Sequence, residues 1–511
     1  MFHVKHFKNK EPFVRGIVFS SFINVVSKII LFATSLLLAN FFGANENTDI
    51  YFYLYSTLWL MVTVFSSLHV SVIIPEAMHR RVREGEGQAM RFLTLFFWLF
   101  LIASIVVVAL IFLDPVMWVS LVSKYKVAIL QGHRTMILAF LPLFSLILIT
   151  QYLVDILNAY RYFTLPVLTG LINNILTLIF LCLFYKGLGL FSMVLALYIG
   201  YLINLGWLIY LMKRDFSWDF SPHKVSLQRL FKQNFWVGLL GNIWNFVGKY
   251  ATNYFLTASG MGLLTAYNYG QKITNVPTEA ITNQFSAVAA IRLNELVAQD
   301  QKEKLKQIFA QLCKMIIFIL VPIAVLFYFY AEDIISLFYL RGEFGVEDVK
   351  NSAFFMRYLG FLLPLYGINT MVTRLYNAGQ IIRFSTIYSV ISNVLLVGFL
   401  WVAFSYWGIW GIPFALLAQN LLNVLVAQIF VKRFFKGIGY GRILGYFGLF
   451  TVGCMALGAS VVALFNLFSS WPELVKAACG CVLFGCVYLG LNEAFSINRD
   501  VSHYIRKWVR L

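Results

Sequence analysis

Polar side chains recur at helical spacing inside stretches that are otherwise apolar. Asn24 and Lys28 lie four residues apart in one such stretch, and Asn245 and Lys249 repeat the spacing in another. Residues three or four apart share one face of a helix. A charge at the centre of a bilayer costs at least about 2.5–3.5 kcal/mol. We therefore expect these faces to contact protein or water rather than lipid.

A third stretch carries Lys272, Asn275 and Glu279 at steps of three and four, with Pro277 between them. Proline leaves one carbonyl without its helical partner, so we expect a bend there. The three lysines outnumber the acids well inside such stretches, Glu279 and Asp155, which predicts a net positive interior. Lysine is a compact charge with three donors and suits phosphate. In the alternative interpretation Lys272 pairs with Glu279 and the other lysines extend to lipid headgroups.

Asp155 and His69 are the other ionisable groups within apolar stretches that we single out. For Asp155 a hydrogen bond between helices and a role in transport both remain open. We interpret His69 as a packing residue.

The elements that position these groups follow from composition. Of 511 residues, 60% are hydrophobic and 12% charged, against about 25% charged in soluble domains. This excludes a soluble enzyme with a water-facing surface, and also a disordered chain. A bilayer requires about 20 mostly apolar residues per helix, and runs this long do not fit barrel strands. We predict an all-α polytopic membrane protein with 14 transmembrane helices. Their limits are 14–42, 49–75, 90–113, 134–159, 163–186, 189–212, 234–258, 262–290, 309–330, 354–377, 384–404, 408–431, 443–466 and 473–495.

The basic residues predict the orientation. With the N-terminus in the cytoplasm, 27 of the 40 Lys and Arg fall in cytoplasmic segments and six outside. Lys and Arg concentrate in cytoplasmic loops. We therefore expect a multi-pass plasma-membrane protein with both termini in the cytoplasm. The same distribution explains most of the net charge of +18 without a nucleic-acid partner.

An internal repeat divides the chain. Asn174 recurs as Asn393, and Asn204 as Asn423, each 219 residues later. The offset covers six helices, an even number, so both copies have one orientation, and parallel repeats of this kind hold their site between the two halves. We predict a six-helix lobe over 1–214, a cytoplasmic linker over 215–233, a second six-helix lobe over 234–433, and two additional helices with a tail over 434–511.

Catalytic and metal signatures are absent from the sequence. HExxH, GxSxG and Walker A motifs do not occur, and Cys479 and Cys481 have no common zinc spacing. We expect no enzyme activity, no cofactor and no metal.

Four short motifs follow one another along the chain. They are Phe42-Gly43-Ala44 with Thr48-Asp49, Ile156-Leu157-Asn158-Ala159 with Phe163 and Pro166, Tyr269-Gly270-Gln271-Lys272-Ile273 with Pro277, and Arg341-Gly342-Glu343-Phe344. In their order and spacing they resemble the MurJ/MviN lipid II flippase family of the MOP exporter superfamily. The resemblance runs through about residues 15–435.

The resemblance implies two lobes around a cationic cavity and a groove for a polyprenyl tail formed by the last two helices. Lys28 and Lys272 stand where the family has cavity arginines, while Thr34 and Ser35 occupy the place of an Arg-Asp pair. The predicted substrate-binding residues are Lys28, Lys249, Lys272, Asn24, Asn245, Asn275, Glu279, Thr34, Ser35 and Asp49.

The leading hypothesis is a bacterial flippase that moves a polyprenyl-pyrophosphate-linked glycan, a lipid II-like peptidoglycan precursor, to the outer leaflet by alternating access. Its partners are then the lipid-linked oligosaccharide and membrane lipids, with cell-envelope biosynthesis enzymes as further candidates. An O-antigen-type flippase of the same superfamily is the main alternative. A multidrug antiporter would require acids in the cavity, and a polytopic transferase would require a catalytic loop residue.

Overall fold

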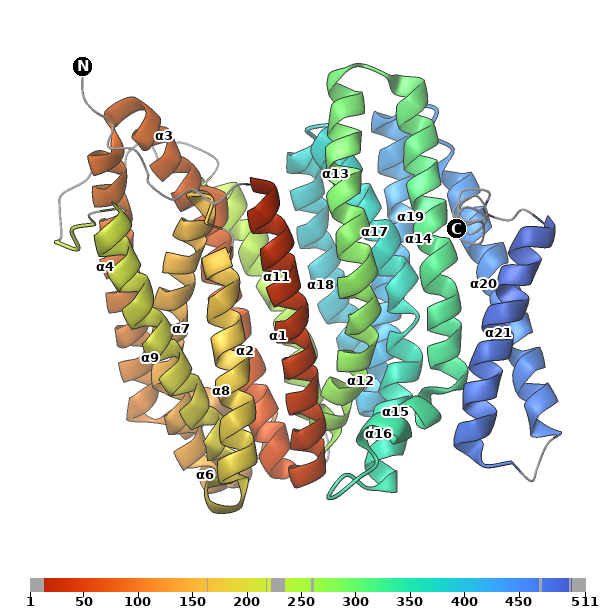
Figure 1. The fold of residues 1–511 in the computed structure, drawn as a ribbon, viewed down its shortest axis with the longest axis horizontal. Helices are drawn as coiled ribbons and strands as arrows, with labels where there is room; N and C mark the ends of the chain where they lie inside the picture. Colours follow the sequence, from red (N-terminus) through yellow and green to blue (C-terminus); the bar gives the residue numbers. More distant parts are fainter. Residues whose placement is uncertain are drawn as a thin grey trace. The chain divides into compact units, whose positions relative to one another are not determined.

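The computed structural model describes residues 13–162, 164–216, 218–221, 235–258, 262–467, 471–495 and 498, and all regular structure among them is helical (Figure 1). The predicted linker over 215–233 and the tail after 495 fall largely outside these residues. The helices of the first half of the chain are α1 (Phe13–Phe42), α2 (Glu46–Leu68), α3 (Ile74–Glu84), α4 (Glu86–Leu113), α5 (Pro115–Leu121), α6 (Val127–Gly132), α7 (Arg134–Ala159), α8 (Thr164–Leu188), α9 (Phe191–Phe216) and α11 (Phe235–Leu256).

The helices of the second half follow the same apolar pattern. They are α12 (Leu263–Pro277), α13 (Asn283–Ala298), α14 (Lys302–Phe329), α15 (Ala331–Tyr339), α16 (Val346–Leu359), α17 (Leu362–Ala378), α18 (Ile382–Trp407), α19 (Ile412–Phe434), α20 (Tyr440–Asn466) and α21 (Glu473–Phe495). A short 3₁₀ turn over Gly408–Gly411 connects α18 to α19.

Ten helical segments of the described chain are long and apolar enough to cross a membrane. This confirms the predicted all-helical polytopic class. Within a bilayer the backbone polar groups must be satisfied inside each segment, which is why long helices carry the chain across. The finer count of fourteen remains a prediction at this point.

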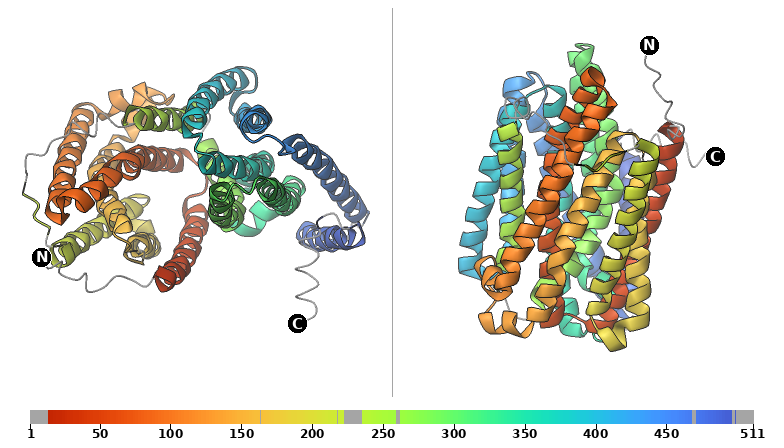
Figure 2. Two further views of the ribbon diagram at one scale, coloured as in Figure 1. Left: turned by 90° about the horizontal axis from the view of Figure 1, so that it is seen from above. Right: turned by 90° about the vertical axis from the view of Figure 1, so that its left-hand side faces the viewer.

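The chain forms two compact units, residues 1–264 and 265–511. In the first unit α7 packs against α2, α4 and α9, α8 lies between α1 and α9, and α11 packs against α2. In the right-hand view of Figure 2 the helices of this unit run side by side. The predicted lobe boundaries at 214 and 234 stay a prediction.

In the second unit α14 is the central helix. It packs against α13, α16, α17 and α20, while α19 packs against α17 and α18. The last two helices, α20 and α21, pack against each other, and α20 also packs against α14.

Two helices are interrupted by π-helical turns. The turn η1 (His69–Ile73) separates α2 from α3, and η2 (Thr278–Thr282) separates α12 from α13. The second turn begins directly after Pro277, where the sequence predicted an irregularity. A proline cannot donate the backbone hydrogen bond that a regular helix needs, so the ladder is broken there.

One predicted span is wrong as a single helix. The run 354–377 consists of parts of α16 and α17, separated at Gly360 and Phe361. Pro364 lies in the first turn of α17, where a backbone N–H has no partner within the helix, so the missing N–H costs no hydrogen bond there. In a continuous helix the proline ring would clash with the carbonyl of Gly360, four residues earlier. Composition alone does not reveal this break, because the run is apolar on both sides of it.

Matching hydrogen bonds occur in the two halves. The Asn204 amide donates to the Thr169 carbonyl and to Asn173 Oδ1, each at 3.0 Å. At positions 219 residues later, Asn423 Oδ1 accepts from the Tyr388 and Ser392 hydroxyls at 2.8 and 2.7 Å. The positions that bond in one half are thus the positions that bond in the other, although the side chains differ.

The Asn204 hydrogen bonds predict a measurable stability loss. Asn204→Ala removes two donated bonds from a side chain that is 0% exposed, and such bonds between membrane helices are worth about 0.6–1.7 kcal/mol. We expect a lower thermal unfolding midpoint in detergent. Ile203→Ala, on the neighbouring exposed face of α9, is the control and should leave the midpoint nearly unchanged. Equal midpoints for the two variants would contradict the assigned role of Asn204.

Candidate substrate-binding site

The first helix carries its polar pair on an exposed face. Asn24 and Lys28 are both exposed, whereas Ser27 is buried. The Asn174 amide on α8 donates to Ser27 Oγ at 2.8 Å, which fixes the face that α1 turns toward α8. The pair therefore lies off the α1–α8 contact.

Thr34 and Ser35 lie further along α1 and are buried. The Thr34 hydroxyl donates to the Ile30 carbonyl at 2.9 Å, and the Ser35 hydroxyl donates to the Phe32 carbonyl at 2.7 Å. Both hydroxyl protons thus serve carbonyls of α1 itself. Such back-bonding is common for Ser and Thr within helices.

Asp49 is buried in the first turn of α2. Its Oδ2 accepts a hydrogen bond from the Gly262 backbone N–H at 2.8 Å. Burial raises the pKa of Tyr125 in the loop between α5 and α6, and the charges of Asp49 and Glu46 raise it further. Asp49 therefore connects the start of α2 to the segment that follows α11.

Gly262 is required for that connection. Its φ is +87°, and a Cβ built on it would lie 2.5 Å from the Ala44 carbonyl oxygen. Only glycine adopts this conformation without strain. The close approach of the two backbones brings the Gly262 N–H within reach of Asp49.

The polar pair of α11 is also exposed. Asn245 and Lys249 are both exposed, and one turn beyond them the Asn253 amide donates to Ser56 Oγ on α2 at 3.0 Å. The predicted polar stripe of α11 is thus partly used for packing against α2. Because α1 packs against α8 and α11 against α2, Lys28 and Lys249 stand on helices with different neighbours.

In the second unit the predicted residues lie around the η2 interruption. Lys272 is half-buried on α12, with its Nζ 5.7 Å from the centre of the Tyr269 ring. Asn275 is exposed on α12, and Glu279 is half-buried in η2. The π turn changes the helical register after Pro277, so the predicted shared face holds for Lys272 and Asn275 and is altered at Glu279.

Arg374 is a residue that the sequence interpretation did not single out. It is half-buried on α17, and its Nε donates to Ser286 Oγ on α13 at 2.7 Å. An arginine within a predicted span is itself a signal for function. Its position near the end of the apolar run 354–377 weakens that signal in the sequence.

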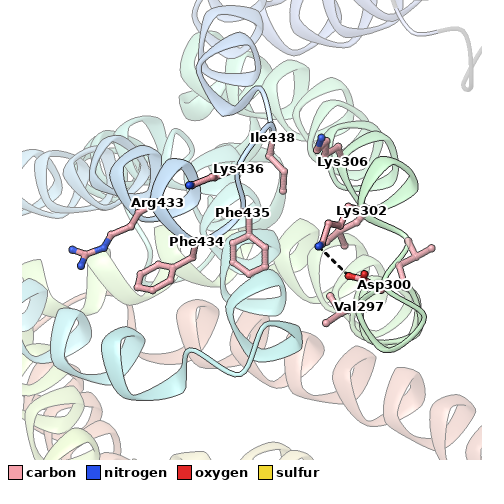
Figure 3. A pocket seen from close by; sticks show the side chains of 11 residues that line it. Val297, Asp300, Lys302, Lys306, Arg433, Phe434, Phe435, Lys436 and Ile438 are labelled. Atoms are coloured by element: carbon pink, nitrogen blue, oxygen red, sulfur yellow. Dashed lines mark ion pairs between the residues drawn. The ribbon is translucent and has the colours of Figure 1, made fainter.

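A cavity of about 390 Å³ in the second unit collects basic residues from the α13–α14 and α19–α20 connections. Figure 3 shows that Arg433 and Lys436 point away from Lys302, which pairs with Asp300 at 3.3 Å. The cations do not converge on one point. We therefore do not assign the anionic headgroup to this cavity.

Comparison with known proteins decides the family. The family model described as "Lipid II flippase MurJ" matches residues 38–476 of the chain. The chain belongs to the MurJ lipid II flippase family. The family suggested by the sequence motifs is thereby confirmed, and so is the prediction of a flippase rather than an enzyme.

Individual relatives agree. A protein of Borreliella burgdorferi named "Probable lipid II flippase MurJ" is 22% identical over 420 residues, 80% of this chain and 81% of the relative. A protein of Aquifex aeolicus with the same name is 23% identical over 447 residues, 82% of this chain and 85% of the relative.

Solved structures establish the fold. "Lipid II flippase MurJ, inward closed conformation" superimposes with a TM-score of 0.76 at 18% identity and covers 95% of this chain and 99% of that one. An inward-facing multidrug resistance MATE transporter of the MOP superfamily gives 0.65 at 14% identity, with 82% of this chain and 98% of that chain covered. The chain shares the MurJ fold, which is related to that of MATE transporters.

The contact between Asp49 and Gly262 predicts a position-specific glycine effect. Gly262→Ala forces a non-glycine residue into a left-handed conformation, which costs about 1–3 kcal/mol, and it opposes the Asp49 hydrogen bond. We expect a clear fall in the thermal unfolding midpoint. In the matched control Gly187→Ala, a helical glycine with nothing within 4 Å of an added Cβ, the midpoint should hold or rise. The reverse order of the two midpoints would refute the proposed role of Gly262.

Proposed function

We propose that this protein moves lipid II, a polyprenyl-pyrophosphate-linked glycan, from the inner to the outer leaflet of the bacterial plasma membrane by alternating access. The observation that carries the proposal is the match of the lipid II flippase family model along residues 38–476. The transported headgroup is a pyrophosphate, so the chain must supply cations within the bilayer to accept it. The lysines on α1, α11 and α12 fit that requirement.

We further propose fourteen transmembrane helices. The ten candidate spans include one long segment, Phe384–Phe434, that contains two helices, α18 and α19. Three further crossings are α11, α12 with α13, and α17, which carry the polar residues that lower their hydropathy. Together these supply fourteen crossings. Polar residues in such helices are the expected mark of a transport pathway.

The matched asparagine hydrogen bonds support two parallel six-helix repeats. Asn204 and Asn423 occupy corresponding positions, and each bonds to the helix that precedes it in its own half. Random similarity of two apolar sequences would not reproduce both the spacing and the bonded positions. The helices α20 and α21 lie outside the repeat, and we assign the polyprenyl tail to them.

We propose that both termini lie in the cytoplasm. The support is the distribution of Lys and Arg, with 27 in the segments assigned to the cytoplasm and six in those assigned to the outside. Such asymmetry sets the orientation of polytopic proteins. It makes the cytoplasmic leaflet the side from which the lipid enters.

We assign pyrophosphate binding to Lys28, Lys249 and Lys272, with Asn24, Asn245 and Asn275 as neutral donors. Lys28 and Lys249 are exposed, and Lys272 is half-buried. An ammonium donates charge-assisted hydrogen bonds to phosphate oxygens. Each positive charge that moves through the membrane potential is also worth about 2.3 kcal/mol per 100 mV.

A second cargo is favoured by one specific observation. Lysine lacks the bidentate fork of arginine, and the Thr34 and Ser35 hydroxyl protons are donated to carbonyls of their own helix. A site built from lysines then recognises the negative charge of a pyrophosphate more than the arrangement of its oxygen atoms. Another lipid-linked glycan fits this weaker selectivity, and mass spectrometry of the co-purified lipid distinguishes the two cargoes.

The lysine assignment predicts loss of transport. Lys28→Ala or Lys272→Ala removes a hydrogen bond to a charged group worth about 1.5–3 kcal/mol, so we expect at least about a tenfold lower flipping rate at limiting substrate. The assay is complementation of a strain depleted of its own flippase, followed by flipping in proteoliposomes.

The control for this test is Lys314→Ala. Lys314 is an exposed lysine in the interior of a long helix, but that helix is α14, not one of the helices α1, α11 and α12 that carry the assigned lysines, and its Nζ lies 5.7 Å from the centre of the Tyr446 ring on α20. We expect this variant to complement fully. Full rescue by both Lys28→Ala and Lys272→Ala would overturn the assignment.

A further inference from the structure

A carboxylate inside the first unit is held by three side-chain donors. Asp155 Oδ2 on α7 accepts from Ser66 Oγ at 2.8 Å and from His69 Nδ1 at 3.1 Å. Its Oδ1 accepts from Gln151 Nε2 at 2.8 Å. Ser66 and His69 lie at the end of α2 and the start of η1, so the group bridges two helices. This confirms one of the two predicted roles of Asp155, a hydrogen bond between helices, and corrects the interpretation of His69 as a packing residue only.

The histidine and the carboxylate of this group are buried. His69 is 0% exposed and Asp155 5% exposed. The His69 ring lies 4.6 Å from the centre of Phe100 and 4.8 Å from that of Tyr152. The Tyr152 hydroxyl is directed elsewhere, donating to the Leu93 carbonyl at 2.8 Å. Aromatic rings thus enclose an imidazole that is hydrogen-bonded to a carboxylate.

Other ionisable groups lie on the elements that pack around His69. Against η1 pack α2, α3, α7 and α11, and Phe100 adds α4. On α3, Glu76 pairs with Arg80 at 2.8 Å. On α11, Lys249 lies one turn from Asn253. The Asn253 amide donates to Ser56 on α2, more than three helical turns before His69 in the sequence.

These elements also carry other ionisable residues. They are Glu46, Asp49, Tyr51, Tyr53 and Tyr55 in the first part of α2, His79, Arg81, Arg83 and Glu84 on α3, Glu86 and Arg91 at the start of α4, Arg134 at the start of α7, and Tyr250 and Tyr254 on α11.

One nitrogen of the pair has no hydrogen-bond partner within the described part of the chain. An ionised carboxylate only accepts, so His69 Nδ1 carries a proton toward Asp155. In the neutral imidazole the lone pair is then on Nε2, which is buried and makes no hydrogen bond among the described residues. The pair carries a net charge of −1 in this state. Binding one proton at Nε2 forms one N–H bond and gives an imidazolium–carboxylate pair of net charge zero.

Low polarity around the pair acts differently on its two protonation states. A net charge inside a bilayer is costly, whereas a hydrogen-bonded ion pair of zero net charge costs less. The new Nε2–H then requires an acceptor that the observed packing does not supply. A change of protonation therefore changes which arrangement of η1 is preferred. The π turn supplies a deformable segment at that point, and such turns recur at functional sites.

The second half carries a fixed charge at the corresponding position. Asp155 is followed 219 residues later by Arg374, and Arg374 also bonds to a serine, Ser286, at 2.7 Å. An arginine stays charged at every accessible pH. The two halves are therefore built alike at this position, but only the first can change its charge.

We propose that His69 and Asp155 form a proton-binding site within the first unit and that proton binding there is coupled to the transport cycle. The coupling rests on the proposed flippase function, whereas proton binding does not. Histidine is the side chain whose charge changes near physiological pH. The chemical ligand is a single proton taken from water, with no other reactant.

The first test measures proton binding without any lipid. Full-length protein labelled at the histidine ring nitrogens is titrated between about pH 5 and 8, and the His69 signal is identified by its loss in His69→Gln. Glutamine keeps an amide donor for Asp155 but does not titrate. We expect the Nε2 signal of His69 to change to the protonated form within this range. A His69 signal that stays in one protonation state throughout would overturn the site.

The second test measures coupling. In proteoliposomes with lipid II we expect wild-type flipping to change about tenfold across about pH 5–8, and His69→Gln and Asp155→Asn to give flat profiles. His133→Gln, at the start of α7, is the matched control and should keep the wild-type profile. An unchanged profile in His69→Gln would overturn the coupling. Titration of His69 in a protein that does not flip lipid II would instead refute the proposed cargo and leave the proton site intact.

Discussion

The low polarity of the bilayer is the constraint on which the rest of the structure depends. Every backbone polar group must be satisfied within its own helix, so the chain crosses as long apolar helices. Each polar side chain in them needs a partner or a function. Asn204 and Asn174 find partners on neighbouring helices. Lys28 and Lys249 are exposed, and we propose that they serve the anionic headgroup.

The same constraint gives different meanings to polar groups of the same type. Asn253 packs against α2 through Ser56, whereas Asn245, two turns earlier on the same helix, is exposed. Asp49 joins two backbone segments through Gly262, whereas Asp155 belongs to the group that we propose as a proton-binding site. Residue type therefore narrows the role of an intramembrane group, and its neighbours decide it.

The sequence predicts the helices well because bilayer thickness fixes their length. The predicted limits 134–159 coincide with α7. Hydropathy does not predict the break at Gly360, because the break depends on how the Pro364 ring meets the carbonyl of Gly360, and the residues on both sides are apolar. The pairing of His69 with Asp155 joins residues 86 positions apart, and no period within one helix encodes such a contact. The lysines were found because a charge in an apolar run is visible without any structure.

The central claim is that intramembrane lysines recognise the pyrophosphate of a lipid-linked glycan. The most direct measurement is the equilibrium affinity of the purified protein for lipid II, compared with an uncharged lipid that carries the same tail and sugars. The account predicts binding at least about tenfold tighter for the pyrophosphate lipid, equivalent to one charge-assisted hydrogen bond or more. Equal affinities for the two lipids would contradict it.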